Sequence, residues 1–122
     1  MTEKIVLLGA GALARDLISI YGHERFSVVY VDPAYKGEET HVNGVEIDSD
    51  WPSMLAKASH YMLAVADQKA RVFMQERARA HGLVPCEPLI YPASFRAPTA
   101  RMGRGSVVTC FVVLGDQAEI AE

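Results

Sequence analysis

Two glycines near the amino terminus and an aspartate farther along the chain have the types and spacing that bind a phosphorylated nucleotide. Gly9 and Gly11 follow an apolar run, and Asp32 stands 23 positions after Gly9. Glycines let the backbone approach a ligand closely, and the N–H groups that open a following helix attract a phosphate. The Asp32 carboxylate could accept a hydrogen bond from a ribose hydroxyl or a base N–H. The pattern G-x-G-x-x-A with a later acidic residue is typical of a dinucleotide site, and a tight turn with a purely structural role is the alternative.

The elements that must position these residues are those of a small α/β domain. Nearly continuous apolar runs predict strands buried in a parallel sheet, and apolar residues at helical spacing predict helices between them. Strands are expected at residues 4–8, 26–31, 61–66 and 86–92, and helices at 12–20, from about 51, and at 67–81. The polar segment 34–46, which contains Asn43-Gly44, predicts a loop with a small hairpin. This order predicts a Rossmann-like parallel sheet in residues 1–91.

Open parallel sheets bind ligands beyond the carboxyl ends of their strands, at the point where the strand order reverses. If the hairpin supplies the third strand and the strand order is 3-2-1-4, the segments that follow the strands at 4–8, 26–31 and 61–66 converge at that point. The candidate substrate-binding residues are therefore Gly9, Gly11, Ala12, Leu13, Asp32, Pro33, Ala66 and Asp67. Asp67 is also expected to cap the helix that it precedes, as Asp50 is for an earlier helix.

A period of six residues runs through the last 27 residues of the chain. The first place of each hexad is held by Arg96, Met102, Val108, Leu114 and Ile120, and the fifth by Ala100, Ser106, Val112 and Ala118. This phase predicts a three-sided parallel β-helix over residues 92–122, and a two-strand hairpin with glycine turns is the alternative. Because such repeats need about three or more units for stability, we expect a truncated piece of a longer protein or a domain whose open end a partner covers.

Composition limits the class of protein. A chain of 122 residues with 50 % apolar content can form one compact core and a small appendage. The net charge of −3, without a basic block, argues against nucleic acid or an anionic membrane as the main partner. No apolar run reaches about 18 residues and no signal peptide is recognised, so a soluble cytoplasmic protein is expected. Cys86 and Cys110 are interpreted as small buried hydrophobic residues, and no metal site is expected.

Taken together, the motifs resemble a known family of sugar acyltransferases. The resemblance rests on G-A-G at 9–11, V-D-P at 31–33, N-G-V at 43–45, A-V-A-D-Q-K-A-R at 64–71, and L-I-Y-P-A-S-F-R-A-P-T-A-R-M-G-R-G-S-V-V at 89–108. These segments look like those of the bacterial sialic acid O-acetyltransferases and UDP-4-amino-sugar N-acetyltransferases. The resemblance spans essentially the whole chain, and the junction between the two predicted units is its most specific part.

The resemblance implies a function and an assembly. In that family a Rossmann-like domain holds the nucleotide-sugar, and a trimeric left-handed β-helix binds acetyl-CoA between subunits. The chain would then be the amino-terminal part of an acetyl-CoA-dependent N- or O-acetyltransferase, homotrimeric at full length. Its substrate would be a UDP- or GDP-linked amino sugar or a sialic acid-type sugar. Carried over, the nucleotide-sugar contacts are Gly9, Gly11, Asp32, Pro33 and Asp67.

Two departures from the family bear on catalysis. The family usually carries a histidine near the sugar where this chain has Leu13, and its catalytic histidine lies on a later coil. The chain's own histidines are His23, His41, His60 and His81, and none is assigned a catalytic role. We therefore expect the chain to bind a nucleotide-sugar without turning it over unaided. Two alternatives stay open, namely an NAD(P)-binding redox module, in which Asp32 would hold the ribose hydroxyls and disfavour NADP, and a non-catalytic interaction domain.

Overall fold

The computed structural model describes residues 3–87, 89–90, 95–96, 101–102, 104, 107–108, 113–114 and 119–120. Its first strands are β1 (Ile5–Leu8), β2 (Phe26–Tyr30), β3 (His41–Val42), β4 (Val45–Asp48), β5 (His60–Leu63) and β6 (Val84–Pro85). The helices are α1 (Ala12–Tyr21), α2 (Trp51–Leu55) and α3 (Gln68–Ala80), with short 3-10 turns η1 (His23–Arg25) and η2 (Pro33–Tyr35). In the described part, the strands form one six-stranded sheet in the order β3-β4-β2-β1-β5-β6, which confirms the predicted Rossmann-like α/β fold.

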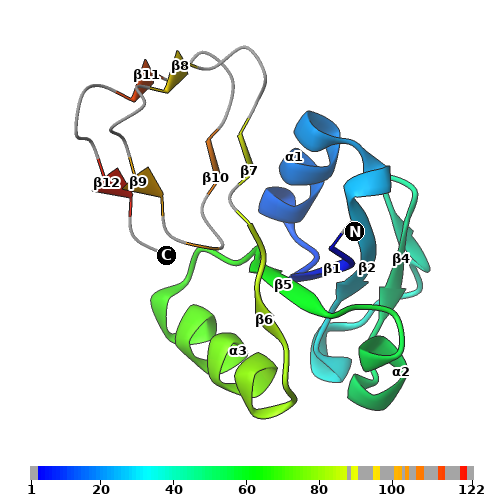
Figure 1. Ribbon diagram of the computed structural model, residues 1–122. Coiled ribbons are helices and arrows are strands. Elements are labelled where there is room, and N and C mark those ends of the chain that lie inside the picture. Colours follow the sequence, from blue (N-terminus) through cyan, green and yellow to red (C-terminus); the bar gives the residue numbers. More distant parts are fainter. Residues whose placement is uncertain are drawn as a thin grey trace.

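Helices cover both faces of this sheet (Figure 1). On one face Leu17 of α1 packs in a core that includes Leu7 of β1. On the other face Met54 of α2 and Met74 of α3 share a core with Leu8 of β1. Leu7 and Leu8 are both fully buried, because a parallel strand between two helical layers has no solvent face. The strands' carboxyl ends are thereby fixed, and they carry the candidate site.

The predicted hairpin is present, and its second strand is also part of the main sheet. Asn43 and Gly44, with φ angles of 45° and 90°, form the turn between β3 and β4. β4 also pairs in parallel with β2, through Val29 and Ile47, so it is an inner strand of the main sheet. The segment 45–48 alternates apolar and polar residues, and a search for continuous apolar runs therefore missed it.

The last strand of the sheet differs from the prediction. It was expected within 86–92, whereas β6 is Val84–Pro85 and pairs with β5. Pro85 is tolerated there because β6 lies at the edge of the sheet, where a missing N–H donor costs little. The predicted strands at 26–31 and 61–66 are shorter at their carboxyl ends, stopping at Tyr30 and Leu63.

The carboxyl-terminal strands keep the six-residue period. They are β7 (Leu89–Ile90), β8 (Phe95–Arg96), β9 (Arg101–Met102), β10 (Val107–Val108), β11 (Val113–Leu114) and β12 (Glu119–Ile120). β7 pairs with β10, β8 with β11 and β9 with β12, always in parallel and between residues 18 positions apart. Figure 1 shows the three pairs at separate places along this part of the chain. Parallel pairing contradicts the hairpin alternative, because the strands of a hairpin are antiparallel.

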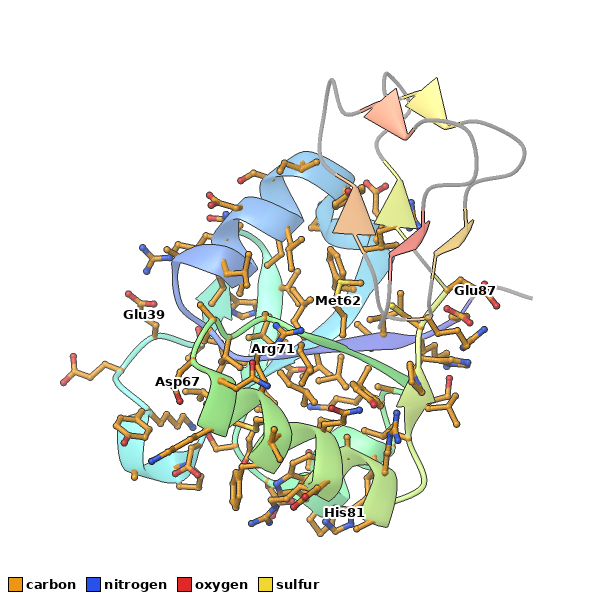
Figure 2. The ribbon with its side chains drawn as sticks, turned by 90° about the vertical axis from the view of Figure 1, so that its left-hand side faces the viewer. Glu39, Met62, Asp67, Arg71, His81 and Glu87 are labelled. Atoms are coloured by element: carbon orange, nitrogen blue, oxygen red, sulfur yellow. The ribbon has the colours of Figure 1, made fainter. Side chains whose placement is uncertain are left out.

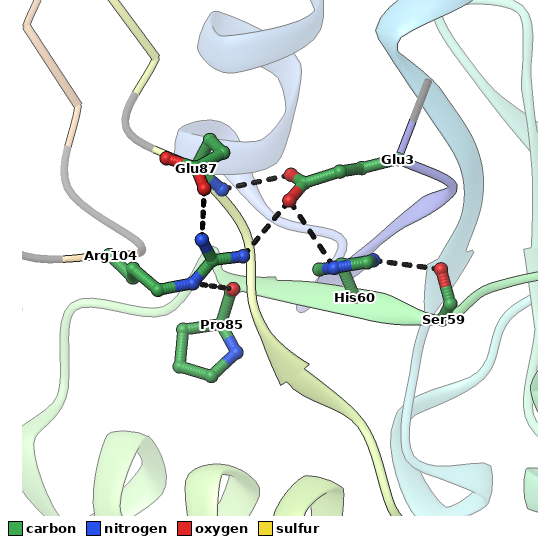
Figure 3. Close-up of polar contacts among 6 residues, drawn as sticks. All are labelled: Glu3, Ser59, His60, Pro85, Glu87 and Arg104. Atoms are coloured by element: carbon green, nitrogen blue, oxygen red, sulfur yellow. Dashed lines mark hydrogen bonds and ion pairs between the residues drawn. The ribbon is translucent and has the colours of Figure 1, made fainter. Parts of the chain in front are cut away.

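Arg104 connects this carboxyl-terminal part to the edge of the sheet (Figure 3). Its Nε donates to the carbonyl of Pro85 at 2.7 Å, and its Nη2 lies 2.9 Å from Oε2 of Glu3. Its Nη1 contacts the carboxylate of Glu87, whose backbone N–H donates to Oε1 of Glu3 at 2.8 Å. His60 lies 3.2 Å from the same Glu3 carboxylate. Glu3 is therefore the acceptor shared by both parts of the chain.

Glu3 should make stability fall in acid. Burial raises the pKa of Glu3, but the Glu87 N–H, Arg104 and His60 outweigh it, and the pKa lies below its ordinary value of 4.5. The stabilisation is thus complete above pH 4.5 and is lost as the pH falls through the lower, folded-state pKa. We expect Glu3→Gln to lower the free energy of unfolding by about 1 kcal/mol at neutral pH and by less in acid. Urea unfolding across this pH range, with the exposed Glu76→Gln as control, measures it; a pH-independent difference would contradict the assignment.

Candidate functional site

A cavity of about 830 Å³ opens at the carboxyl ends of β1, β2 and β5. The turn after β1 contributes Gly9, Ala10 and Gly11, and the end of β2 contributes Tyr30, Val31 and Asp32. The remaining walls are the loop Tyr35, Lys36, Gly37, Glu38 and Glu39, the strand residues Ile47 and Val65, and the α3 residues Ala70, Phe73 and Met74. Figure 2 shows this region between the amino-terminal end of α3, near Asp67, and the loop that carries Glu39. The size suits one small molecule of nucleotide dimensions.

The structure brings together some of the predicted site residues. Gly9, Gly11 and Asp32 line the cavity. Ala12, Leu13, Pro33, Ala66 and Asp67 are exposed residues outside its lining. The loop at 35–39 and the α3 residues Phe73 and Met74 were missed, because nothing in their spacing indicates that they face the turn after β1.

The two glycines have different physical roles. Gly9 has φ +129°, and a Cβ placed on it would lie 2.6 Å from Cγ1 of Val65 and 2.7 Å from the carbonyl oxygen of Ala64. Gly9 therefore allows the end of β1 to pass close to the segment after β5, which gives it a structural role in addition to its place in the cavity lining. A Cβ on Gly11 would meet no atom within 4 Å. Packing does not require glycine at this position, so Gly11 stays a candidate for close approach by a ligand.

The amino terminus of α1 differs from those of the other helices. Asp50 caps α2 by accepting from Ser53 N–H, and Asp67 caps α3 by accepting from Ala70 N–H, both at 2.9 Å. Both caps were predicted. In α1, among the described residues, Gly11 stands at the cap position without a side-chain hydrogen bond, and the first turn carries no acidic residue. The first N–H groups of α1, beside the cavity, can therefore donate to an anion.

Asp32 links the cavity to the η2 turn. Its Oδ1 accepts from the N–H of Ala34 at 2.9 Å, and its backbone carbonyl accepts from the N–H of Tyr35 at 2.9 Å. Burial, followed by the nearby Asp32 charge, raises the pKa of Tyr30, so the phenol stays protonated at neutral pH. Asp32 therefore presents a carboxylate acceptor to the cavity and also fixes the loop that carries Tyr35.

The loop and the glycine turn bring different charges to the cavity. Asp32 and the loop that follows it carry three carboxylates, the others being Glu38 and Glu39, and the ammonium of Lys36. Glu39 lies 3.8 Å from Arg15, and both side chains are more than half exposed, so this pair contributes little. The glycine turn, beside the amino terminus of α1, adds no charged side chain to the lining. An anionic group is favoured at the glycine turn, and N–H or O–H donors are favoured at the loop.

Within the described residues, no group of three or more His, Cys, Asp or Glu side chains is placed to hold a metal ion. None of the helices in the part of the chain that the structure describes is long and apolar enough to cross a membrane. Burial raises the pKa of the Cys86 thiol to about 12. Cys86 therefore stays a protonated core residue, as predicted.

Solved structures of sugar acetyltransferases share this fold. The chain is similar to perosamine N-acetyltransferase from Caulobacter crescentus in complex with CoA and GDP-perosamine, where a variant gives a TM-score of 0.77 at 23 % identity over 98 % of this chain and 57 % of that one. PerB from the same organism, in complex with the same two ligands, gives a TM-score of 0.78 at 23 % identity over 100 % of this chain and 58 % of that one. The acetyltransferase domain of PglB from Neisseria gonorrhoeae, in complex with acetyl coenzyme A, gives 0.62 at 21 % identity over 98 % and 62 %.

The chain thus spans less than two thirds of the length of each of these structures. No protein-family model matches the sequence, and the comparison with curated proteins gave no match. The similarity confirms, at the level of the fold, the resemblance to sugar acyltransferases that the motifs indicated.

Proposed function

We propose that the chain is the nucleotide-sugar-binding part of an acetyl-CoA-dependent sugar N- or O-acetyltransferase. The observation that carries this proposal is the cavity itself, which joins an uncapped helix amino terminus to a carboxylate-bearing loop at the carboxyl edge of the sheet. The pyrophosphate would lie at the N–H groups after Gly11, and the nucleoside would extend toward Asp32. Structures of similar fold that hold GDP-perosamine together with CoA support the same assignment.

The carboxyl-terminal strands would supply the acetyl donor's site. Pairing at intervals of 18 residues, or three hexads, supports the first coils of a left-handed parallel β-helix. Since β7 pairs with β10, we place the start of this unit at Leu89, slightly before the expected boundary after residue 91. Three copies would assemble into a homotrimer with acetyl-CoA between subunits, as in the family that the sequence resembles.

The reaction would be acyl transfer. The sugar amine or hydroxyl attacks the thioester carbonyl of acetyl-CoA, an N–C or O–C bond forms, the C–S bond breaks, and CoA leaves as the thiol. A general base takes the proton of the attacking group, a role that the family resemblance assigns to a histidine on a later coil. The part of this enzyme described above would bind and orient the nucleotide-sugar.

Calorimetric titration with GDP- and UDP-linked amino sugars tests the proposal. We expect saturable binding with at least one of them, because the cavity offers a phosphate site and acceptor groups in a volume of about 830 Å³. Absence of heat with every nucleotide-sugar, under conditions that detect millimolar binding, would remove the proposal. Binding of NADH in preference to all nucleotide-sugars would favour the redox-module alternative.

A further inference from the structure

We infer that Phe73 of α3 is the platform on which the nucleobase of the bound nucleotide stacks, with Tyr35 of η2 on the same cavity. The inference rests on the proposed nucleotide-binding function and adds the location of the base within the cavity. Neither residue is among the candidate site residues expected from the sequence. Both emerge from the walls of the cavity alone.

Exposure singles out these two side chains. In the described part of the chain, the large apolar side chains that remain exposed are Leu13, Tyr35, Val72, Phe73 and Val84. Of these, Tyr35 and Phe73 line the cavity. Phe73 is 49 % exposed, whereas Met74, the next residue of α3, is buried. A flat apolar ring exposed at the wall of a cavity offers a stacking surface to any base, since every base has a π-face.

Arg77 links the Phe73 ring to a buried aromatic pair. The guanidinium carbon of Arg77 lies 5.5 Å from the centroid of the Phe73 ring and 5.4 Å from that of Trp51. Trp51 is buried and stacks on His81, with ring centroids 4.8 Å apart and an interplanar angle of 18°. Because these contacts restrain the ring before a ligand arrives, less conformational entropy is lost on stacking.

Charge places the base, rather than the phosphates, beside Tyr35 and Phe73. Asp32, Glu38 and Glu39 put three carboxylates on the walls that also hold Tyr35 and Phe73, against one Lys36. These carboxylates would repel a pyrophosphate and can accept hydrogen bonds only, which suits the N–H groups of a base edge. The pyrophosphate is directed instead to the amino terminus of α1, which carries no acidic residue in its first turn.

Titration calorimetry with GDP and UDP tests the platform. Phe73→Leu keeps an apolar side chain but removes the flat face, and we expect it and Phe73→Ala to weaken binding by about 5- to 100-fold. Phe73→Tyr should bind within about 2-fold of the unaltered chain, because it keeps the ring. Val72→Ala is the matched control, since Val72 is 45 % exposed on the same helix and lies outside the cavity lining.

The outcomes separate this inference from the proposed function. If the unaltered chain binds neither GDP nor UDP, the proposed function fails and the inference fails with it. If the unaltered chain binds and Phe73→Leu binds equally well, the platform is wrong while the nucleotide site stands. If Val72→Ala weakens binding as much as Phe73→Ala, the effect belongs to α3 as a whole, and the platform is again wrong. Circular dichroism of each variant shows that it remains folded.

Discussion

Replacing Gly9 by alanine is expected to destabilise the fold by about 2–4 kcal/mol, through overpacking and backbone strain together. The added Cβ would sit 2.6 Å from Cγ1 of Val65 and 2.7 Å from the Ala64 carbonyl oxygen, and the second contact is with backbone that cannot rotate away. The φ of +129° is in addition unfavourable for any residue with a side chain. Urea unfolding followed by circular dichroism measures the loss.

Gly11→Ala is the matched control for this substitution. Its Cβ meets no atom within 4 Å and its φ of −87° suits alanine, so the free energy of unfolding should stay within about 0.5 kcal/mol of the unaltered chain. The methyl group would nevertheless stand in the cavity that Gly11 lines, and nucleotide binding should weaken. Equal stability of the two variants would show that Gly9 is not needed for the packing of β1 against β5.

Local chemistry explains the features that the sequence predicted well. Asp50 and Asp67 were recognised as helix caps because a short acceptor side chain can bond the N–H three residues on, whatever the rest of the fold does. Asn43-Gly44 was recognised as a turn because few residues adopt the positive φ that both have. Such features depend on neighbours in the chain, so one sequence is enough to find them.

Long-range arrangement explains what was missed. β4 pairs with β2 after the chain has returned through η2 and β3. The alternating residues 45–48 do not indicate that β2 is the strand with which they pair. Phe73 and Met74 are adjacent on α3, yet Phe73 is exposed at the cavity wall while Met74 is buried in the core. Whether a residue on an amphipathic helix faces a core or a cavity depends on what lies opposite, and here that is the loop at 35–39.

The hexads are a case in which a period carries long-range information. A six-residue repeat predicts that residues 18 apart lie side by side if three hexads close one coil. The described strands are paired at this separation, and each ends on the first residue of a hexad or, for β7, at Ile90 one period earlier. The period predicted the strand pairing because similar repeat units bury the same face against each other. The separation of two residues in the sequence is then enough to say which residues pair.

Asp32→Asn is expected to weaken nucleotide binding by about 10- to 100-fold with little change in stability. Asparagine can still accept from the N–H of Ala34 and so keep the η2 turn, because Asn and Asp are comparable caps. What is removed is the negative charge that makes the hydrogen bonds to a ribose hydroxyl or a base N–H strong. Calorimetry with GDP and UDP measures the affinity, and urea unfolding measures the stability.

Asp32→Ala separates the two roles of this carboxylate. It removes the cap as well as the charge, so it should cost about 1 kcal/mol of stability in addition to weakening the binding of nucleotide. Asp50→Asn makes the same chemical change as Asp32→Asn at a cap outside the cavity lining, and it should leave nucleotide affinity unaltered. If Asp32→Asn binds nucleotide as well as the unaltered chain, then the carboxylate serves the η2 turn alone. The ligand would in that case be held by other parts of the lining, among them the glycine turn, the loop at 35–39 and the apolar wall of α3.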